Sequence, residues 1–512
     1  MQAKLEELKS RLIEINDLRR AGEMLSWDQS TYMPAGGASA RARQLASLGR
    51  IAQEKFIDPH VGQLLDELEP YVERMPYDSD DASLVRATRR EYERMSKVPP
   101  DFMGEFYNHM SECYQAWTQA RPQNDFARMA PLLERTLDLS RQLANYFPGY
   151  EHIADPLIDF EDSGMRVSTL RDLFNKLRLQ LVPLVKAITD QDPIDDSCLR
   201  RYYPEAKQLA FYREMTACLG YDFKRGRLDK THHPFEVSFS IGDARIATRL
   251  NENHLGEGLF NTLHEAGHGI YEQGIHPNLE GTLLANGASS GWHESQSRLW
   301  ENMVGRSRLC WEYFYPRLQS VFPGQLGDTS LETFYRAINK VQPSLIRTDA
   351  DEVTMNLHVM IRFDLEVALL EGSLAVKDLP QAWNARYESD LGITPPDDRD
   401  GVLQDMHWYS WSVGGNFQSY ALGDILSAHL FSYALRAHPE ILDEFHQGRF
   451  STLHSWLKEN VYQHGSKFTA PELIKRLFGE SLSIEPYVHY LQTKYADVYM
   501  LESQAYPGAS KI

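Results

Sequence analysis

Apolar residues recur at three- and four-residue steps along most of the chain, which is the periodicity of amphipathic helices. The first stripe lies in residues 4–20, where Leu5, Leu8, Leu12 and Ile15 fall on one helical face. The same pattern returns in residues 38–55, 79–95, 104–120, 126–146 and 168–190. Proline and glycine separate these stretches, at Pro99–Pro100, Pro148–Gly149 and Pro193. The pattern predicts a mainly α-helical fold.

One stretch departs from the helical pattern and alternates with a period of two, as a half-buried strand does. The apolar residues of this alternation are Phe235, Val237, Phe239 and Ile241. Gly242–Asp243 then offers a turn, and residues 245–248 offer a return strand. We expect a small antiparallel β-sheet here, next to the motif that follows it.

The pattern shows no boundary that would divide the chain into independent domains. The composition does not shift along the chain, and neither a flexible linker nor a repeat of roughly 30–45 residues occurs. We therefore expect a single domain over residues 1–512. Its N-terminal helical part would cover about 1–200 and its second part about 201–512, and neither would be independent.

Charge and cysteine usage narrow the class of protein. The chain has 53 Lys plus Arg and 72 Asp plus Glu, so its formal charge is −19, which argues against nucleic acid and anionic membranes as partners. The N-terminus lacks the apolar segment of a signal peptide, and no long apolar run predicts a membrane span. The cysteines show no C-x-x-C pairing, so we expect a cytoplasmic protein with reduced thiols. They are Cys113, Cys198, Cys218 and Cys310.

The main chemical motif is H-E-x-x-H, formed by His264, Glu265 and His268. On a helix, residues four apart lie about 5–6 Å from each other on one face, so both imidazoles can bind one Zn²⁺ and the Glu can reach a metal-bound water. Two unrelated surface histidines are the alternative. Gly267 and Gly269 lower helix propensity by ~1 kcal/mol each, and we expect them to allow close packing onto this helix.

A catalytic zinc site needs a third protein ligand, and the chain offers several carboxylates. The extension H-x-x-G-x-x-H is absent after His268. Glu294 is the first candidate, because the Gly/Ser-rich residues 286–291 before it would let the chain reverse and bring a second helix beside the first. Glu272 and Glu301 are the other candidates, and Glu301 is also a candidate partner behind a ligand.

Five further motifs accompany H-E-x-x-H in a fixed order. They are His233-Pro234-Phe235, Asp243-Ala-Arg245-Ile-Ala247, His293-Glu294-Ser-Gln-Ser297, Ile346-Arg347-Thr-Asp-Ala-Asp351 and Gly401-Val-Leu-Gln404-Asp405-Met-His407-Trp408. With these motifs the chain resembles the thermostable carboxypeptidase Taq family of zinc metallocarboxypeptidases, from Trp27-Asp28 to about Tyr495. Two positions depart from the family pattern. Ala247 stands where the family usually has Thr, and Gln418 stands where it has Pro.

The resemblance implies a set of functional residues and a mode of assembly. His264, His268 and Glu294 would be the metal ligands, and Glu265 would be the general base. Two His and one Glu suit one Zn²⁺ per chain, and Co²⁺ fits the same set. The resemblance also implies a homodimer. We expect two groups of helices to form two lobes that flank a deep cleft, with the small sheet beside the H-E-x-x-H helix.

A carboxypeptidase also needs a cation for the terminal carboxylate of its substrate. Arg347 is the first candidate, because a guanidinium binds a carboxylate bidentately, and Arg245 is the second. The alternative is that Arg347 forms a structural ion pair with Asp349 or Asp351.

Hydrogen-bond donors must stabilise the tetrahedral oxyanion, and we name His407 and Tyr420 for this role. A structural role is the alternative for each. His233 either lines the substrate pocket or fixes the turn before Pro234. The strand of residues 237–241 offers its backbone to an extended substrate.

The sequence thus predicts a metal-dependent carboxypeptidase that releases single C-terminal amino acids from peptides with broad specificity and acts poorly at C-terminal Pro. A related endopeptidase or dipeptidyl carboxypeptidase is one alternative. An inactive zinc-binding peptide receptor is another, and the presence of Glu265 argues against it.

Overall fold

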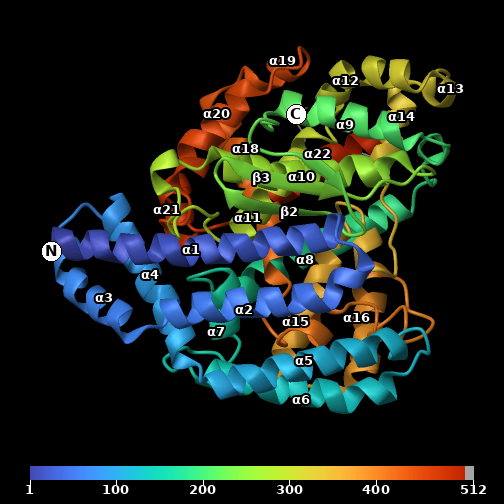
Figure 1. Cartoon of the computed structure of the whole chain (residues 1–512). Helices are drawn as coiled ribbons and strands as arrows, with labels where there is room; N and C mark the ends of the chain where they lie inside the picture. The colour runs from blue at the N-terminus through green and yellow to red at the C-terminus, as the bar shows by residue number, and fades with distance from the viewer. Residues whose placement is uncertain (502–512) are drawn as a thin grey trace. The chain divides into compact units, whose positions relative to one another are not determined.

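Helices make up most of the chain, as the apolar periodicity predicts (Figure 1). The computed structural model describes residues 1–501. They form two units, each built from three stretches of chain. Unit 1 consists of Met1–Ser96, Asp195–Ile338 and Leu430–Leu473. Unit 2 consists of Lys97–Ile194, Asn339–His429 and the chain from Ile474 onward. The single domain with parts of about 1–200 and 201–512 stays a prediction.

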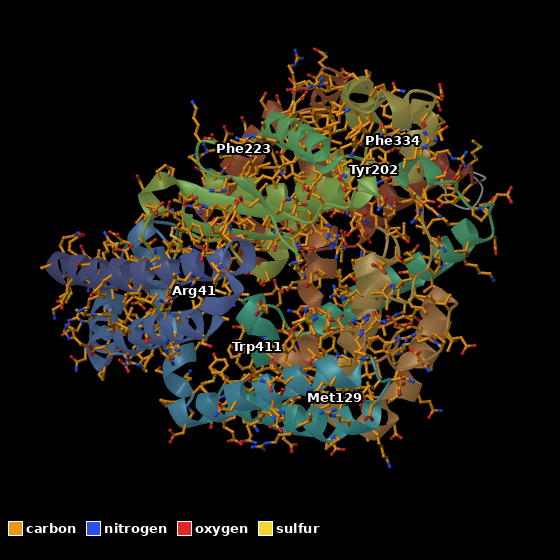
Figure 2. All side chains as sticks on the ribbon, turned by 45° about the vertical axis from the view of Figure 1, so that its right-hand side comes forward. Arg41, Met129, Tyr202, Phe223, Phe334 and Trp411 are labelled. Carbon is orange, nitrogen blue, oxygen red and sulfur yellow. The ribbon has the colours of Figure 1, made fainter. Side chains whose placement is uncertain are left out.

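Unit 1 contains the N-terminal helices and the helices around the H-E-x-x-H motif. The former are α1 (Gln2–Thr31), α2 (Ala38–Phe56), α3 (Pro59–Val72) and α4 (Asp80–Lys97). The latter are α9 (Glu205–Leu219), α10 (Leu255–Gly274), α11 (Ser290–Arg298), α12 (Arg308–Val321), α13 (Pro323–Leu326), α14 (Leu331–Ile338), α19 (Ile441–Phe445) and α20 (Ser451–Asn460). Phe334 of α14, labelled in Figure 2, packs against Trp311 and Tyr315 of α12.

The stripe predicted on the first helix forms part of a hydrophobic core. Leu5, Leu8, Leu12 and Ile15 are all buried, and they belong to a cluster with apolar residues of α3 and α4. The polar positions between them stay largely at the surface. This is the outcome that a three- and four-residue repeat predicts.

The sheet of unit 1 is small and mixed. Its strands β1 (Leu228–Lys230), β2 (Phe235–Ser240) and β3 (Asp243–Thr248) lie in the order β1-β3-β2. The predicted hairpin is present, because β2 and β3 pair antiparallel with Val237 opposite Arg245. β1 pairs parallel with β3 and was not predicted, since three residues are too few to show an alternation. Helix α10 packs along β2 and β3 (Figure 1).

Unit 2 is helical. Its helices are α5 (Pro100–Ala120), α6 (Phe126–Asn145), α7 (Asp155–Glu161), α8 (Val167–Thr189), α15 (Met355–Glu371), α16 (Leu379–Leu391), α17 (His407–Ser410) and α22 (Glu485–Tyr499). Asp125 caps α6 by accepting a hydrogen bond from the backbone N–H of Arg128 at 3.0 Å. Met129, labelled in Figure 2, is one of the fully buried residues of α6.

Three helices contribute residues to both units: α4, whose last residue Lys97 belongs to unit 2, α18 (Gln418–Ala437) and α21 (Ala470–Phe478). Within residues 1–501, none of the helices is both long and apolar enough to cross a membrane. The mainly α-helical fold and the small sheet beside α10 are confirmed; the cleft stays a prediction.

Candidate metal centre

Helix α10 carries the H-E-x-x-H motif and begins at a side-chain cap. His254 Nδ1 accepts a hydrogen bond from the backbone N–H of Glu257 at 3.2 Å. The carboxylate of Glu257 lies in the first turn, where the helix dipole favours negative charge. Leu259 and Leu263 are fully buried and fix the face that α10 turns inward.

The two glycines beside the motif allow close packing onto α10. A Cβ atom on Gly267 would lie 2.5 Å from the carbonyl oxygen of Gln296 and 2.7 Å from the Cα atom of Ser297. A Cβ on Gly269 would lie 2.7 Å from the ring of Tyr221. Glycine is therefore required where α11 crosses α10, and the packing predicted from these glycines is confirmed.

Three side chains converge at this crossing. Glu294 Oε2 lies 3.6 Å from Nε2 of His264 and 3.6 Å from Nε2 of His268. The three donor atoms all lie within 4.8 Å of one another, the one such group found among residues 1–501. Two imidazole nitrogens and a carboxylate oxygen are the donor set of many catalytic zinc sites, so these residues fit a divalent metal.

A π-helical turn, Leu299–Val304, extends α11 and carries Glu301. The carboxylate oxygen Oε2 of Glu301 accepts a hydrogen bond from Nδ1 of His264 at 2.9 Å. Arg306 Nη2 donates to the other oxygen at 3.2 Å. Glu301 is therefore a partner behind His264, as the sequence allowed, and π-helical turns occur frequently at functional sites.

Arginine neutralises part of the acidic cluster. Arg298 Nε donates to Glu294 Oε1 at 2.7 Å, which leaves Oε2 facing the two imidazoles. Burial alone raises the pKa of Glu294, but Arg298 and His264 outweigh it and hold this pKa well below its usual range. Burial also raises the pKa of Glu301, and its bond to His264 together with Arg298 lowers it to about 2. Both carboxylates are thus ionised at neutral pH.

Two further carboxyl groups of the cluster have raised pKa values. Burial, opposed by His264, raises the pKa of Glu265 to about 7. Burial and the nearby Glu272 raise the pKa of Glu236, on β2, to about 8. A carboxyl group with a pKa near neutrality is suited to accept and return a proton, so Glu265 fits a general base.

The environment of His268 differs from that of His264. His268 Nδ1 lies 2.5 Å from Nδ1 of His293, and His293 Nε2 lies 2.9 Å from Glu272 Oε1. Glu272, one of the candidates for the third ligand, therefore lies behind His293 and outside the group of three donor atoms.

Arg347 belongs to a second charged cluster, in unit 2. Its Nε donates to Asp405 Oδ2 at 2.7 Å, and Nε of Arg362 donates to the same oxygen at 3.0 Å. Arg347 thus forms a structural ion pair, as the alternative interpretation allowed, but its partner is Asp405 and not Asp349 or Asp351. Local spacing could not predict this pair, because Asp405 follows Arg347 by 58 positions.

His407 and Tyr420 lie in the same cluster as Arg347. His407 Nδ1 forms a short hydrogen bond with Asp405 Oδ1, which turns Nε2 of the ring away from Asp405. The guanidinium carbon of Arg347 lies 5.3 Å from the ring centre of Tyr420 and 5.6 Å from that of Phe417. The structure therefore brings these three predicted residues together within unit 2.

Arg245 and His233 lie in unit 1 and already have partners. Arg245 binds Asp243 bidentately, at 2.8 and 2.7 Å, and its guanidinium lies over the ring of Trp27. His233 is exposed, and its Nδ1 donates to the carbonyl of Pro234 at 2.8 Å, as expected of a turn-fixing residue. Arg20 of α1 donates to the carbonyl of Ser238, so part of the β2 edge expected to receive a substrate is occupied.

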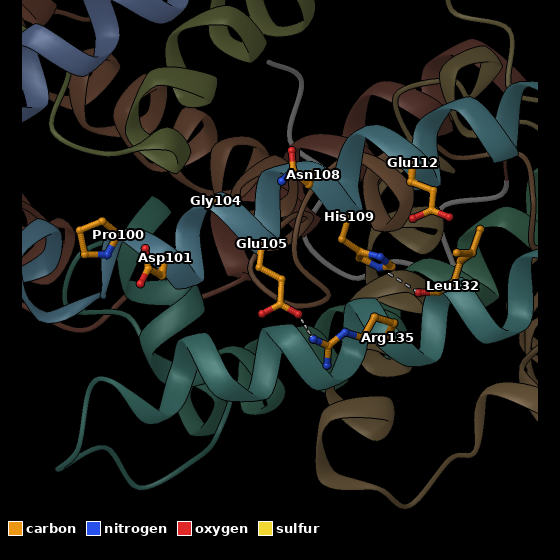
Figure 3. Close-up of a pocket in the computed structure, with 9 residues that line it drawn as sticks. All are labelled: Pro100, Asp101, Gly104, Glu105, Asn108, His109, Glu112, Leu132 and Arg135. Atoms are coloured by element: carbon orange, nitrogen blue, oxygen red, sulfur yellow. Dashed lines mark hydrogen bonds and ion pairs between the residues drawn. The ribbon is translucent and has the colours of Figure 1, made fainter.

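A surface depression in unit 2 lies between α5 and α6, away from both clusters in sequence (Figure 3). Glu105 forms an ion pair with Arg135 across it, and His109 hydrogen-bonds to the carbonyl of Leu132 at 3.2 Å. The predicted site residues do not line it. Its lining consists of Pro100, Asp101, Gly104, Glu105, Asn108, His109, Glu112, Leu132 and Arg135.

Comparison with known proteins agrees with this geometry. The family model for carboxypeptidase Taq (M32) metallopeptidases matches residues 7–495. The chain belongs to this family. It is therefore a metallocarboxypeptidase, and the predicted family and enzyme class are confirmed. The metallopeptidase family implies a divalent metal, and the group of His264, His268 and Glu294 offers it a site.

Curated and solved members of the M32 family are similar over nearly their whole length. Thermostable carboxypeptidase 1 of Thermus thermophilus is 40% identical over 94% of this chain and 96% of its own. Carboxypeptidase 1 of Bacillus subtilis is 36% identical over 96% and 97%. The crystal structure of the M32 carboxypeptidase from Deinococcus radiodurans R1 superposes with a TM-score of 0.95 at 44% identity, covering 97% of this chain and 100% of that one.

Sequence reasoning gave no role to several residues of the two clusters. Asp405 and His293 stood inside quoted motifs, next to residues that were assigned a role. Arg298 lies one helical turn after Glu294, a spacing at which side chains meet, so the pair was detectable from the sequence. Phe417 offered no signal.

Proposed function

We propose that this metallocarboxypeptidase removes single C-terminal amino acids from peptides, with Zn²⁺ held by His264, His268 and Glu294 and with Glu265 as the general base. The observation that carries the proposal is the convergence of two Nε2 atoms and one carboxylate oxygen beside a buried Glu265. Co²⁺ would fit the same donor set.

The chemistry divides between the metal and the side chains of the chain. A bound divalent cation would supply Lewis acidity to the scissile carbonyl and would acidify a water molecule. Glu265 takes the proton from the attacking water and returns it to the leaving amine. Its burial favours this role, because burial keeps its pKa close to neutrality.

We assign the terminal carboxylate of the substrate to Arg347. Two guanidinium groups share the single carboxylate of Asp405, so this cluster keeps a positive excess that suits an anion. Arg245 is the less suitable candidate, because Asp243 already holds its guanidinium bidentately. We assign oxyanion stabilisation to Nε2 of His407 and to the hydroxyl of Tyr420, and a contact in the substrate pocket to His233.

The decisive experiment is mass spectrometry of a peptide digested with the wild type and with Glu265→Gln, each zinc-loaded and with its metal content measured. We expect the wild type to produce a ladder that shortens by one residue from the C-terminus, and Glu265→Gln to retain zinc but lose most activity. A Glu265→Gln variant that trims at the wild-type rate would refute the mechanism.

The same digest separates the alternative functions. Internal fragments would indicate an endopeptidase, and released dipeptides would indicate a dipeptidyl carboxypeptidase. A zinc-loaded wild type that binds peptides but leaves them intact would indicate a receptor.

Specificity is tested with peptides that differ in their last residue. We expect release of many different residues and slow release of Pro, whose bond to the preceding residue has no N–H.

Assembly and location are separate proposals. We propose a homodimer, which light scattering on the purified protein tests by its mass relative to the 58.9 kDa chain. A cytoplasmic location, proposed from the cysteine usage, is tested by cell fractionation.

A further inference from the structure

The two histidines of the metal centre have different partners behind them. His264 Nδ1 contacts a carboxylate, Glu301 Oε2, at 2.9 Å. His268 Nδ1 contacts another imidazole, His293 Nδ1, at 2.5 Å, and a carboxylate follows one step later, where His293 Nε2 lies 2.9 Å from Glu272. Hydrogen-bond partners behind a metal-binding histidine fix its ring orientation and its tautomer.

Only one arrangement of protons satisfies the hydrogen bonds that link His268, His293 and Glu272. A neutral imidazole that binds a metal through Nε2 carries its proton on Nδ1. His268 must then donate to His293 Nδ1, which has to be an acceptor. A neutral His293 carries its own proton on Nε2 and donates it to Glu272. Each contact has one donor and one acceptor only in this arrangement.

We propose that His293 is a positioning residue that, together with Glu272, fixes the orientation and the Nε2-binding tautomer of His268. The inference rests on the metal site proposed above and adds two residues that hold one of its ligands. Neither residue touches the substrate in this account, and both act through His268.

The surroundings of His293 are built to hold its ring. The backbone N–H of Gly287 donates to Glu272 Oε1 at 3.1 Å and so fixes the carboxylate that contacts His293. The ring of Tyr271 lies 5.3 Å from that of His293. A Cβ atom on Gly287 would lie 2.6 Å from Cδ2 of His293, so a side chain at this position would displace the ring.

Two substitutions of His293 separate hydrogen bonding from packing. His293→Gln keeps an acceptor for His268 and a donor for Glu272 but loses the ring, whereas His293→Phe keeps the ring and loses both hydrogen bonds. The measurements are the zinc dissociation constant, by competition with a chelator, and the visible absorption of the Co²⁺-loaded protein, which reports ligand geometry.

We expect His293→Phe to weaken zinc binding about 10- to 100-fold and to shift the Co²⁺ bands, as loss of a partner behind a ligand does. His293→Gln should stay within a few-fold of the wild type. The reverse order, with Phe close to the wild type and Gln impaired, would assign His293 to packing and overturn the proposal, and so would wild-type zinc affinity and spectrum in both variants.

Gly287→Ala keeps His293 itself and serves as the second variant should either substitution prevent folding. We expect it to weaken zinc binding and shift the Co²⁺ bands because it moves the ring, and an unchanged spectrum would count against the proposal. A wild type that binds no zinc at these residues would refute the metal site itself, which is a different outcome from an intact site that ignores His293.

Discussion

Two regions of the molecule differ in the ratio of carboxyl to guanidinium groups. Around His264 in unit 1, carboxyl groups outnumber guanidinium groups, with Glu265, Glu294 and Glu301 against Arg298 and Arg306. Around Asp405 in unit 2, the order is reversed, because Arg347 and Arg362 share one carboxylate.

This difference makes each region electrostatically complementary to its proposed ligand. Buried charged groups are stable only when they are paired, so a region rich in acidic groups favours a cationic ligand and a region rich in basic groups favours an anionic one. A divalent cation would balance the first cluster, and a substrate carboxylate would balance the second. The overall charge of −19 therefore does not prevent the binding of an anion, because the local excess at Arg347 is positive.

The first expected effect follows from removing a carboxylate of the first cluster. Glu294→Gln removes the charged oxygen that faces both imidazoles and leaves Arg298 without its nearest carboxylate. We expect zinc affinity to fall by more than about 100-fold, beyond the effect of losing a partner behind a ligand. Chelator competition measures this, with the exposed Glu214→Gln as the control. Unchanged affinity would remove Glu294 from the metal site.

The second effect tests the positive excess of unit 2. Arg347→Met should lower kcat/KM for peptides with a free C-terminal carboxylate. The loss should correspond to about 2–5 kcal/mol of transition-state stabilisation, because a charge-assisted contact is lost. C-terminally amidated peptides should be poor substrates of the wild type and should be affected less. An equal loss for free and amidated peptides would mean that Arg347 does not bind the carboxylate.

The third effect is a loss of folding stability at low pH, through protonation of Asp405. Burial raises the pKa of Asp405, but Arg347 and the hydrogen bond from His407 outweigh it and hold this pKa well below its usual range. The stability from this carboxylate is therefore present above a pH of about 4 and is lost as the pH falls further. Asp405→Asn should lower stability by ~3–5 kcal/mol at pH 6.

Thermal unfolding at pH 6, 4 and 3 would measure this dependence. The stability difference between wild type and Asp405→Asn should shrink as the pH falls, since acids common to both proteins cancel. A difference that stays constant down to pH 3 would contradict the lowered pKa.

The smallest effect is expected at the surface, where charges are solvated. Lys176 and Asp172 form a 2.7 Å ion pair on α8, with both side chains more than half exposed. Asp172→Ala should change the unfolding free energy by less than ~0.5 kcal/mol, as is usual for exposed pairs. A larger loss would show that the contrast between buried and exposed charges is overstated.

The sequence revealed the parts of these regions that depend on local spacing. His264 and His268 are four residues apart on one helix, and the two glycines beside them predicted the close crossing that brings Glu294 to both. The pairing of Arg347 with Asp405 joins residues 58 positions apart. No periodicity encodes such a contact, because it depends on how separate helices pack. β1 could not be predicted for a different reason, because its three residues are too few to show an alternating pattern.

The most direct test of the metal centre is anomalous X-ray diffraction at the zinc edge from crystals of the zinc-loaded protein. We predict one strong peak per chain within about 2.0–2.2 Å of Nε2 of His264, Nε2 of His268 and Oε2 of Glu294. A peak bound elsewhere, or one that contacts Nδ1 of either histidine, would contradict the account.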